Sequence, residues 1–234
     1  MYPYYYYFYD YSYIIFVLPV LIASLIVQSK MKRTYSKYSR IANSRHITGA
    51  QAAEIVLRYY NIYNVNIIPV NGTLTDAYDP RKNEIRLSSD VFSGSSIAAI
   101  GVACHEAGHA AQYAEGYAPV KWRTAIFPVT QIGSYASIPL LLIGLFLSFD
   151  PLIWIGIGFF AFTTLFQLVT LPVEFNASRR ALSVIETNGL LTVEEKDGAR
   201  KVLTAAAMTY VAALATSVAQ LLRLIIRFGG NRRR

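Results

Sequence analysis

Two long uncharged stretches lie next to each other in the second half of the chain. Residues 125–149 and residues 152–171 contain no Asp, Glu, Lys or Arg. A helix needs roughly 20 apolar residues to cross a hydrocarbon core about 30 Å thick, and each stretch is long enough. Asp150 and Pro151 separate them, and this pair favours a turn because proline disfavours helix at the preceding residue. The pattern predicts a hairpin of two membrane-spanning helices over residues 125–171.

An apolar segment near the N-terminus predicts a further span. Residues 14–27 are apolar, and eight of the first 13 residues are tyrosine, a residue that favours the membrane interface. The following segment, residues 29–40, is basic and contains no acidic residue. A cleavable signal peptide has the opposite polarity, with its charges before the apolar part. We therefore expect residues 1–28 to form an uncleaved anchor with its N-terminus outside the cell.

The C-terminal segment, residues 202–234, contains a fourth candidate. Residues 202–222 are uncharged, and basic residues follow from Arg223 onward. A full crossing from the cytoplasm would leave these basic residues outside, against the positive-inside rule. The sequence leaves two alternatives open: a helix that crosses the membrane, or one that packs without crossing.

Basic residues around the hairpin indicate its orientation. They stand on both flanks and are absent from its tip. The flanking residues are Lys121, Arg123, Arg179 and Arg180. Both ends of the hairpin are therefore expected in the cytoplasm, and the chain is expected to be a multi-pass protein of the cell membrane.

The composition supports a membrane protein and not a nucleic-acid-binding one. Hydrophobic residues make up 54% of the chain, and the net charge is +8. The positive charges flank apolar segments and do not form one long stripe. The expected partner is therefore the lipid bilayer, including its anionic lipids, and no nucleic acid. Nothing in the sequence indicates an oligomeric state.

The polar segment, residues 29–124, predicts a small α+β unit. Thr48 is a candidate N-cap for a helix, and a second helix is expected within residues 93–114. Three strands are expected between them, over residues 65–70, 73–78 and 84–88. The predicted fold class is mainly α: a multi-span helical membrane protein with a small unit made of a short sheet and a helix that carries the motif below.

The second of these helices contains the motif HEAGH. The chain has 3 histidines, and His105 and His109 are two of them. Residues four apart lie on one face of a helix, so both imidazoles can bind one zinc ion. Glu106 lies outside that pair and can act as a base on a water molecule at the open position. The alternative is a chance pattern on an amphipathic helix, but its place in an apolar run and Gly108 beside it favour a metal site.

A catalytic zinc site needs a third protein ligand. His46 begins a separate helix and is expected to be solvated. Glu174 directly follows the hairpin, on the same predicted side of the membrane as His105, and is the better candidate. Pro172 is expected to begin the helix that carries Glu174, within residues 172–201. The remaining candidate carboxylates are expected to be solvated: Glu115, Glu186, Glu194 and Glu195.

The motifs together resemble the YugP-like family of membrane zinc metallopeptidases. The resemblance rests on LTDAYDPRKNEIRLS, ACHEAGHAAQY, LPVEFNASRRAL and AAAMTYVAALA, in this order, and covers nearly the whole chain after the first anchor. HExxH followed by a glutamate also resembles the gluzincin arrangement. The resemblance implies a zincin-like unit with one Zn2+ per chain on His105, His109 and Glu174, and Glu106 as general base and acid. It also implies a protease, expected to be an endopeptidase acting on proteins or peptides, membrane proteins among them.

The sequence departs from the family pattern around the site. Asn176 stands where an aspartate is common, and Ala77 where a histidine is common. Many gluzincins have an aspartate four residues after the glutamate, which orients a ligand histidine, and here that residue is Ser178. A serine can accept the same hydrogen bond, but a neutral partner raises the basicity of the ligand less.

Five further residues near the motifs have a structural interpretation and a functional one. Cys104, the single cysteine, is expected to be a packing residue. Arg179 and Arg180 could pair with a carboxylate or an oxyanion, but the preferred interpretation is a positive anchor at the membrane face. Tyr113 and Tyr117 could donate to an oxyanion and are expected to pack.

The leading functional hypothesis is an integral membrane zinc endopeptidase with its site at the cytoplasmic face. The alternative is a non-catalytic membrane interaction protein that keeps a structural zinc site. A transporter is disfavoured because no ionisable residue lies inside a predicted span. Substrate is expected to add as a strand to an exposed sheet edge, provided by residues 73–78 or 84–88.

Overall fold

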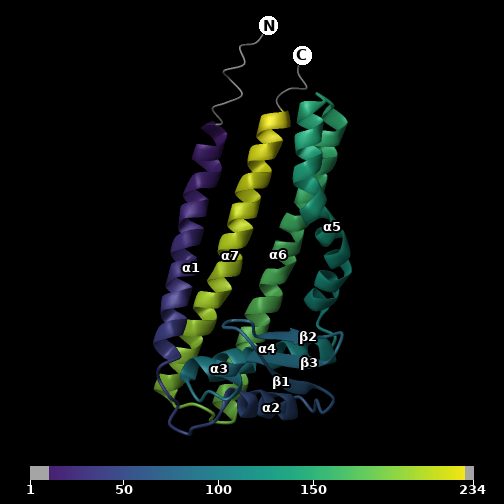
Figure 1. The fold of residues 1–234 in the computed structure, drawn as a ribbon. Coiled ribbons are helices and arrows are strands. Elements are labelled where there is room, and N and C mark those ends of the chain that lie inside the picture. Colours follow the sequence, from purple (N-terminus) through teal and green to yellow (C-terminus); the bar gives the residue numbers. More distant parts are fainter. Residues whose placement is uncertain (1–10, 230–234) are drawn as a thin grey trace. The chain divides into compact units, whose positions relative to one another are not determined.

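The computed structural model describes residues 11–229, so the predicted interfacial tyrosines up to residue 10 lie outside the described part, as does the tail from residue 230. The predicted fold class is confirmed, because long helices dominate and one short sheet is present (Figure 1). In chain order the elements are a π-helix at Tyr13–Val17, α1 (Leu18–Tyr38), α2 (Gly49–Tyr59), β1 (Asn66–Val70), β2 (Ala77–Asp79), β3 (Glu84–Ser88), α3 (Ser89–Phe92), α4 (Ile97–Ala114), α5 (Ala118–Phe146), α6 (Asp150–Thr187) and α7 (Val193–Gly229).

The chain divides into two compact units. One, here called the membrane unit, comprises residues 1–28, 122–170 and 209–234; the other, the site unit, comprises residues 29–121 and 171–208. Within residues 11–229, four helical segments are long and apolar enough to cross a membrane: Tyr13–Tyr38, α5, α6 and α7. The segment 202–222, which the sequence left open, lies within α7 and meets the same criterion.

Close helix contacts hold the membrane unit together. Helices α5 and α6 form the predicted hairpin, and a Cβ at Gly133 or Gly156 would lie 2.9 Å from a backbone oxygen of the facing helix. Only glycine permits so close an approach. Between α6 and α7, the buried hydroxyls of Thr164 and Ser217 form a 2.8 Å hydrogen bond, the kind of polar contact that joins helices in lipid.

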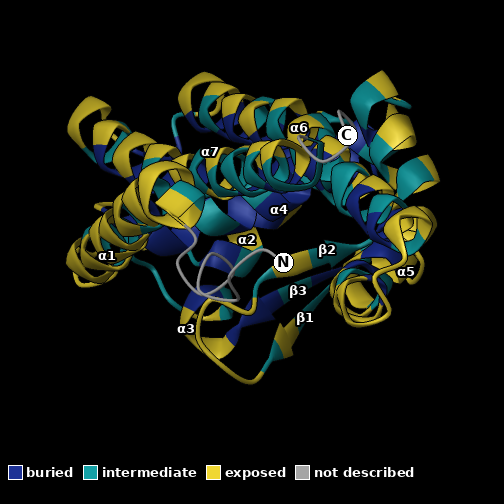
Figure 2. Cartoon of the chain, turned by 90° about the horizontal axis from the view of Figure 1, so that it is seen from above, coloured by how far each residue is buried: buried dark blue, intermediate teal, exposed yellow. Residues whose placement is uncertain are grey.

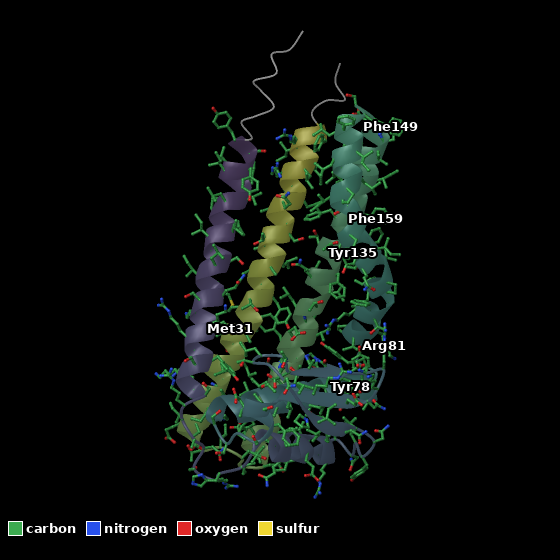
Figure 3. All side chains as sticks on the ribbon, viewed as in Figure 1. Met31, Tyr78, Arg81, Tyr135, Phe149 and Phe159 are labelled. Atoms are coloured by element: carbon green, nitrogen blue, oxygen red, sulfur yellow. The ribbon has the colours of Figure 1, made fainter. Side chains whose placement is uncertain are left out.

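Many large apolar side chains of this unit are exposed. Tyr135 on α5 and Phe149 at the hairpin turn, both labelled in Figure 3, are exposed, and so is Phe146. Exposed apolar side chains would be costly in water and are expected of helices that face lipid.

The site unit contains a three-stranded sheet in the order β1-β3-β2. β1 pairs with β3 in parallel, and β2 pairs with β3 antiparallel, with Tyr78 opposite Ile85. β1 and β3 lie within the predicted segments, whereas β2 shares only residues 77 and 78 with the predicted strand 73–78 and continues to Asp79. Pro69 is compatible with β1 because that strand is at the edge. β3 is the central strand, so the expectation that residues 84–88 could be a free edge is wrong, and β2 is the edge that remains of the two candidates.

Helices α2 and α4 build the core of the site unit with the sheet. Both begin as predicted: the Thr48 side chain accepts from the backbone N–H of Gln51 in a capping box, and Ser96 caps α4. Ile85 and Leu87 of β3 point into this core, which Figure 2 shows as the dark blue parts of β3 and α4. Cys104 is completely buried there, which confirms its packing role.

The part of α6 that belongs to the site unit crosses α4 at Gly108. A Cβ on Gly108 would lie 2.8 Å from the backbone oxygen of Ala177. Gly108 was expected to leave room beside a metal. In the structure, its missing side chain allows α6 to approach α4. The prediction that a helix begins at Pro172 is wrong, because Pro172 lies inside α6, next to the point where the two units divide. Helices tolerate an internal proline where packing on both sides offsets the missing hydrogen bond.

A basic groove lies on the last turns of α1 and the residues that follow. Among the residues that the structure describes, no acidic side chain lines this groove. Its lining consists of Lys32, Arg33, Ser36, Lys37, Arg40 and Ile41. These residues belong to the site unit.

Candidate metal centre

Helix α4 presents the two histidines of the HEAGH motif on one face. The rings of His105 and His109 lie edge to face, with centroids 4.7 Å apart. Successive turns of an α-helix stack residues i and i+4, so this arrangement follows from the spacing alone. Both side chains are mostly buried, with 15% and 11% of their surfaces exposed. The pair therefore offers two imidazole nitrogens at one point of a largely buried site.

Glu174, from α6, completes the group. Its Oε2 atom lies 3.3 Å from Nε2 of His105 and 3.6 Å from Nε2 of His109. One potential ligand atom from each of the three residues lies within 4.8 Å of the other two. The close crossing at Gly108 makes this possible, because Glu174 and Ala177 lie on successive turns of α6.

The spacing of these donor atoms suits a zinc ion. With metal–ligand bonds of 2.0–2.1 Å and tetrahedral angles, neighbouring ligand atoms lie about 3.3 Å apart. The two distances to Glu174 are close to that value. Two imidazoles and one carboxylate are also a common ligand set of catalytic zinc sites, in which the fourth position is open. The residues therefore fit the metal that the sequence predicts.

The electrostatic environment of the group also favours a cation. Burial by itself lowers the pKa of His109, but the hydrogen bond to Glu174 and the charges of Glu106 and Glu174 outweigh it and leave that pKa raised. The same negative charges that favour a proton on the imidazole would favour a metal ion in its place.

Each of the two candidate ligand histidines has a partner on its second ring nitrogen. Nδ1 of His105 lies 3.1 Å from the hydroxyl of Ser178, so the predicted serine partner is confirmed. Nδ1 of His109 lies 3.0 Å from Oε1 of Gln112. Such contacts orient the ring and leave Nε2 available for a metal.

Glu106 lies next to the ligand group and outside it. Its side chain is buried, and Oε2 accepts a 2.9 Å hydrogen bond from the backbone N–H of Tyr78. Tyr78 belongs to the edge strand β2 and is labelled in Figure 3. The hydrogen bond therefore joins the candidate base on α4 to an edge strand of the sheet.

Other residues near the motifs have structural roles. His46 is exposed and is not part of the ligand group. Arg180, expected to be a membrane-face anchor, instead forms a 2.7 Å ion pair with Glu115. Glu115 itself is exposed, as predicted. The Tyr113 ring contacts the Tyr78 ring, and the Arg180 guanidinium lies over Tyr117, so both tyrosines have packing contacts as predicted.

The sequence did not predict the contact between Gln112 and Asn176, which lie next to the candidate metal site. In the sequence, Asn176 stands out only as a departure from the family pattern, and no motif marks Gln112. Nε2 of Gln112 donates to Oδ1 of Asn176 at 2.9 Å. Gln112 lies three residues after His109, on the same helical face, and this spacing is the signal that could have identified it.

Comparisons with known proteins identify the family of this chain. The model of a family described as "Putative neutral zinc metallopeptidase" matches residues 13–229. The "Putative membrane protease YugP" of Bacillus subtilis (strain 168) is 45% identical over 209 residues, which are 89% of this chain and 93% of the relative. No solved structure matches the chain. The resemblance seen in the motifs is thus confirmed, and the chain belongs to this family of membrane zinc metallopeptidases.

Proposed function

We propose that this protein is an integral membrane endopeptidase that uses one zinc ion, held by His105, His109 and Glu174. The observation that carries the proposal is the convergence of two imidazole nitrogens and one carboxylate oxygen within 4.8 Å. A second carboxylate, that of Glu106, follows His105 on the same helix. When bound there, zinc would polarise the scissile carbonyl and lower the pKa of a water molecule.

Glu106 is proposed as the general base and then the general acid. It would take a proton from the attacking water and deliver it to the nitrogen of the leaving amine. Burial keeps bulk water from competing for its carboxylate, and the Tyr78 N–H holds one oxygen in place. His105 and His109 would keep their Nε2 atoms available because their Nδ1 atoms are engaged by Ser178 and Gln112.

The substrate is proposed to be an extended peptide that lies along the outer edge of β2, beside Glu106. Main-chain hydrogen bonds to an edge strand give affinity with little side-chain selectivity. The Tyr78 N–H that bonds Glu106 points away from β3, so this edge and the candidate base are adjacent. An extended chain that continues on both sides of the site is a protein or a long peptide, which supports endopeptidase activity.

The proposed orientation has the site unit on the cytoplasmic side of the cell membrane. The support is the charge distribution: the basic segment after the first apolar helix and the basic flanks of the hairpin both lie in or next to the site unit. With four crossings, the N-terminus and the C-terminus would both lie outside.

Glu106→Gln tests the catalytic proposal. Purified protein is incubated with fluorescent casein and with a mixed peptide library, and cleavage sites are mapped by mass spectrometry. The variant should keep its zinc and lose cleavage by about 100-fold or more, the scale of general base catalysis. Cleavage that is the same in both proteins would instead favour the non-catalytic membrane interaction protein with a structural zinc site. Products trimmed only from chain ends would contradict endopeptidase action.

A further inference from the structure

A chain of hydrogen bonds leads away from His109 through three side chains. Nδ1 of His109 lies 3.0 Å from Oε1 of Gln112, and Nε2 of Gln112 lies 2.9 Å from Oδ1 of Asn176. The same Asn176 oxygen accepts a 2.7 Å hydrogen bond from Nε of Arg180. The chain thus runs from α4 to α6 and ends at a guanidinium.

The guanidinium determines the direction of every bond in this chain. Arginine has only donors, so the atom of Asn176 that faces it must be the amide oxygen. That oxygen can only accept, so the atom of Gln112 that faces it must be the amide nitrogen. The Gln112 nitrogen also donates to the backbone carbonyl of Val173 at 2.8 Å, which independently requires the same orientation.

The tautomer of His109 follows from the orientation of Gln112. With its nitrogen committed to two acceptors, Gln112 can present only its oxygen to His109. The Nδ1 atom of His109 must then carry the proton, and Nε2 is left to face Glu174. Ser178 cannot do the same for His105, because a hydroxyl can either donate or accept.

The far end of the chain is held firmly. Arg180 forms an ion pair with Glu115 at 2.7 Å, and its guanidinium lies over the rings of Tyr60 and Tyr117. Gln112 has no exposed surface, so water cannot replace its partners. Reorienting the Gln112 amide would place two acceptors against its oxygen and leave its nitrogen facing His109, which is costly in a buried site.

We propose that Gln112, Asn176 and Arg180 form a relay that fixes His109 as the Nδ1–H tautomer and so prepares Nε2 to bind the metal. Gln112 is a positioning residue, because it acts through His109. The inference rests on the proposed zinc site. In the relay, Asn176 accepts the hydrogen bonds from Gln112 and Arg180. The aspartate that is common at this position in the family could accept the same two bonds.

Zinc affinity, measured by competition with a chelator, is the first test. Gln112→Met keeps the length and removes the acceptor, and we expect affinity to fall about 10- to 100-fold, as for other groups that orient metal ligands. Gln112→Glu distinguishes two effects on zinc binding: the hydrogen-bond relay and the negative charge near the metal. An added negative charge alone would strengthen zinc binding, whereas the relay predicts weaker binding because the second oxygen would face Val173 and Asn176, both acceptors. Asn176→Asp should bind zinc nearly as well as the wild type.

A spectroscopic readout accompanies the affinity. With 3 histidines in the chain, 15N-histidine labelling gives few signals. In zinc-loaded wild-type protein the Nδ1–H of His109 should exchange slowly with solvent, and in Gln112→Met it should exchange rapidly. Asn176→Leu, which interrupts the chain further from the metal, should lower affinity and protection in the same direction. Circular dichroism and gel filtration check that each variant is folded.

The outcomes distinguish this inference from the proposed function. Wild-type zinc affinity and proton protection in Gln112→Met, or tighter zinc binding in Gln112→Glu, would overturn the relay. If the relay alone is wrong, the wild type still binds zinc and cleaves in a Glu106-dependent manner. A wild-type protein that binds no zinc would overturn the proposed function and the relay together.

Discussion

Replacing Gly108 by alanine should weaken the metal site without touching any ligand. The new Cβ would lie 2.8 Å from the backbone oxygen of Ala177, about 0.6 Å short of the 3.4 Å at which ordinary contact begins. The opposing atoms are backbone, so no side-chain rotation can relieve the contact. Helices α4 and α6 must then separate, and Glu174 moves away from His105 and His109.

The size of the effect can be worked from these distances. A shift of about 0.6 Å would widen the Nε2–Oε2 distances to roughly 4 Å, compared with about 3.3 Å for a tetrahedral site. Metal sites tolerate deviations of only about 0.2 Å in bond length, so zinc affinity should fall by at least about tenfold, equivalent to about 1.4 kcal/mol. Overpacking should cost about 1–3 kcal/mol of stability, against a gain of about 1 kcal/mol in helix propensity.

Gly101→Ala is the matched control. It lies on the same helix and gains the same helix propensity, but its Cβ would be 3.5 Å from the nearest atom, the Cβ of Ala199. Zinc affinity by chelator competition and melting temperature are measured for both variants in detergent. The difference between the variants reports the effect of the contact between residue 108 and Ala177. Gly101→Ala should bind zinc like the wild type and melt at or above its temperature. Equal zinc affinity and equal melting temperature for the two variants would refute the argument that Gly108 sets the approach of α6.

Three further predictions concern the ligands, the topology and the lipid. Glu174→Ala should reduce zinc from about one per chain to much less in purified protein, and full retention of zinc would remove Glu174 from the site. In intact cells a membrane-impermeant maleimide should label Ser148→Cys at the hairpin turn but not Arg81→Cys, and the reverse pattern would invert the orientation. The native Cys104 should stay unlabelled, because it is buried and burial raises its pKa. Replacing the four basic residues of the basic groove by glutamine should lower the anionic lipid that co-purifies, measured by mass spectrometry, and unchanged lipid content would contradict a role in lipid contact.

Local patterns in the sequence were enough to predict most of the helices and strands and two of the three candidate metal ligands. Long uncharged stretches require helices that cross a membrane, because a backbone in lipid must satisfy its own hydrogen bonds. The i, i+4 spacing of His105 and His109 places both on one helical face whatever surrounds the helix. Thr48 predicts a helix start because capping depends only on the next three residues. Glu174 could be selected from its place after the hairpin, but no local rule brings it to the histidines.

Only the tertiary structure decided the features that depend on neighbours distant in sequence. The strand order shows that β2, and not β3, has a free edge, because pairing involves residues that the pattern of one strand does not specify. α6 continues through Pro172, although proline by itself favours a helix start or a break. The roles of Gly108 and Gln112 likewise appear only where α4 meets α6, at Ala177 and Asn176. The sequence of α4 determines which side chains could bind a metal. The approach of α6 determines which side chains lie close enough to bind it together. That approach is set by contacts between segments more than 60 residues apart, which no local pattern specifies.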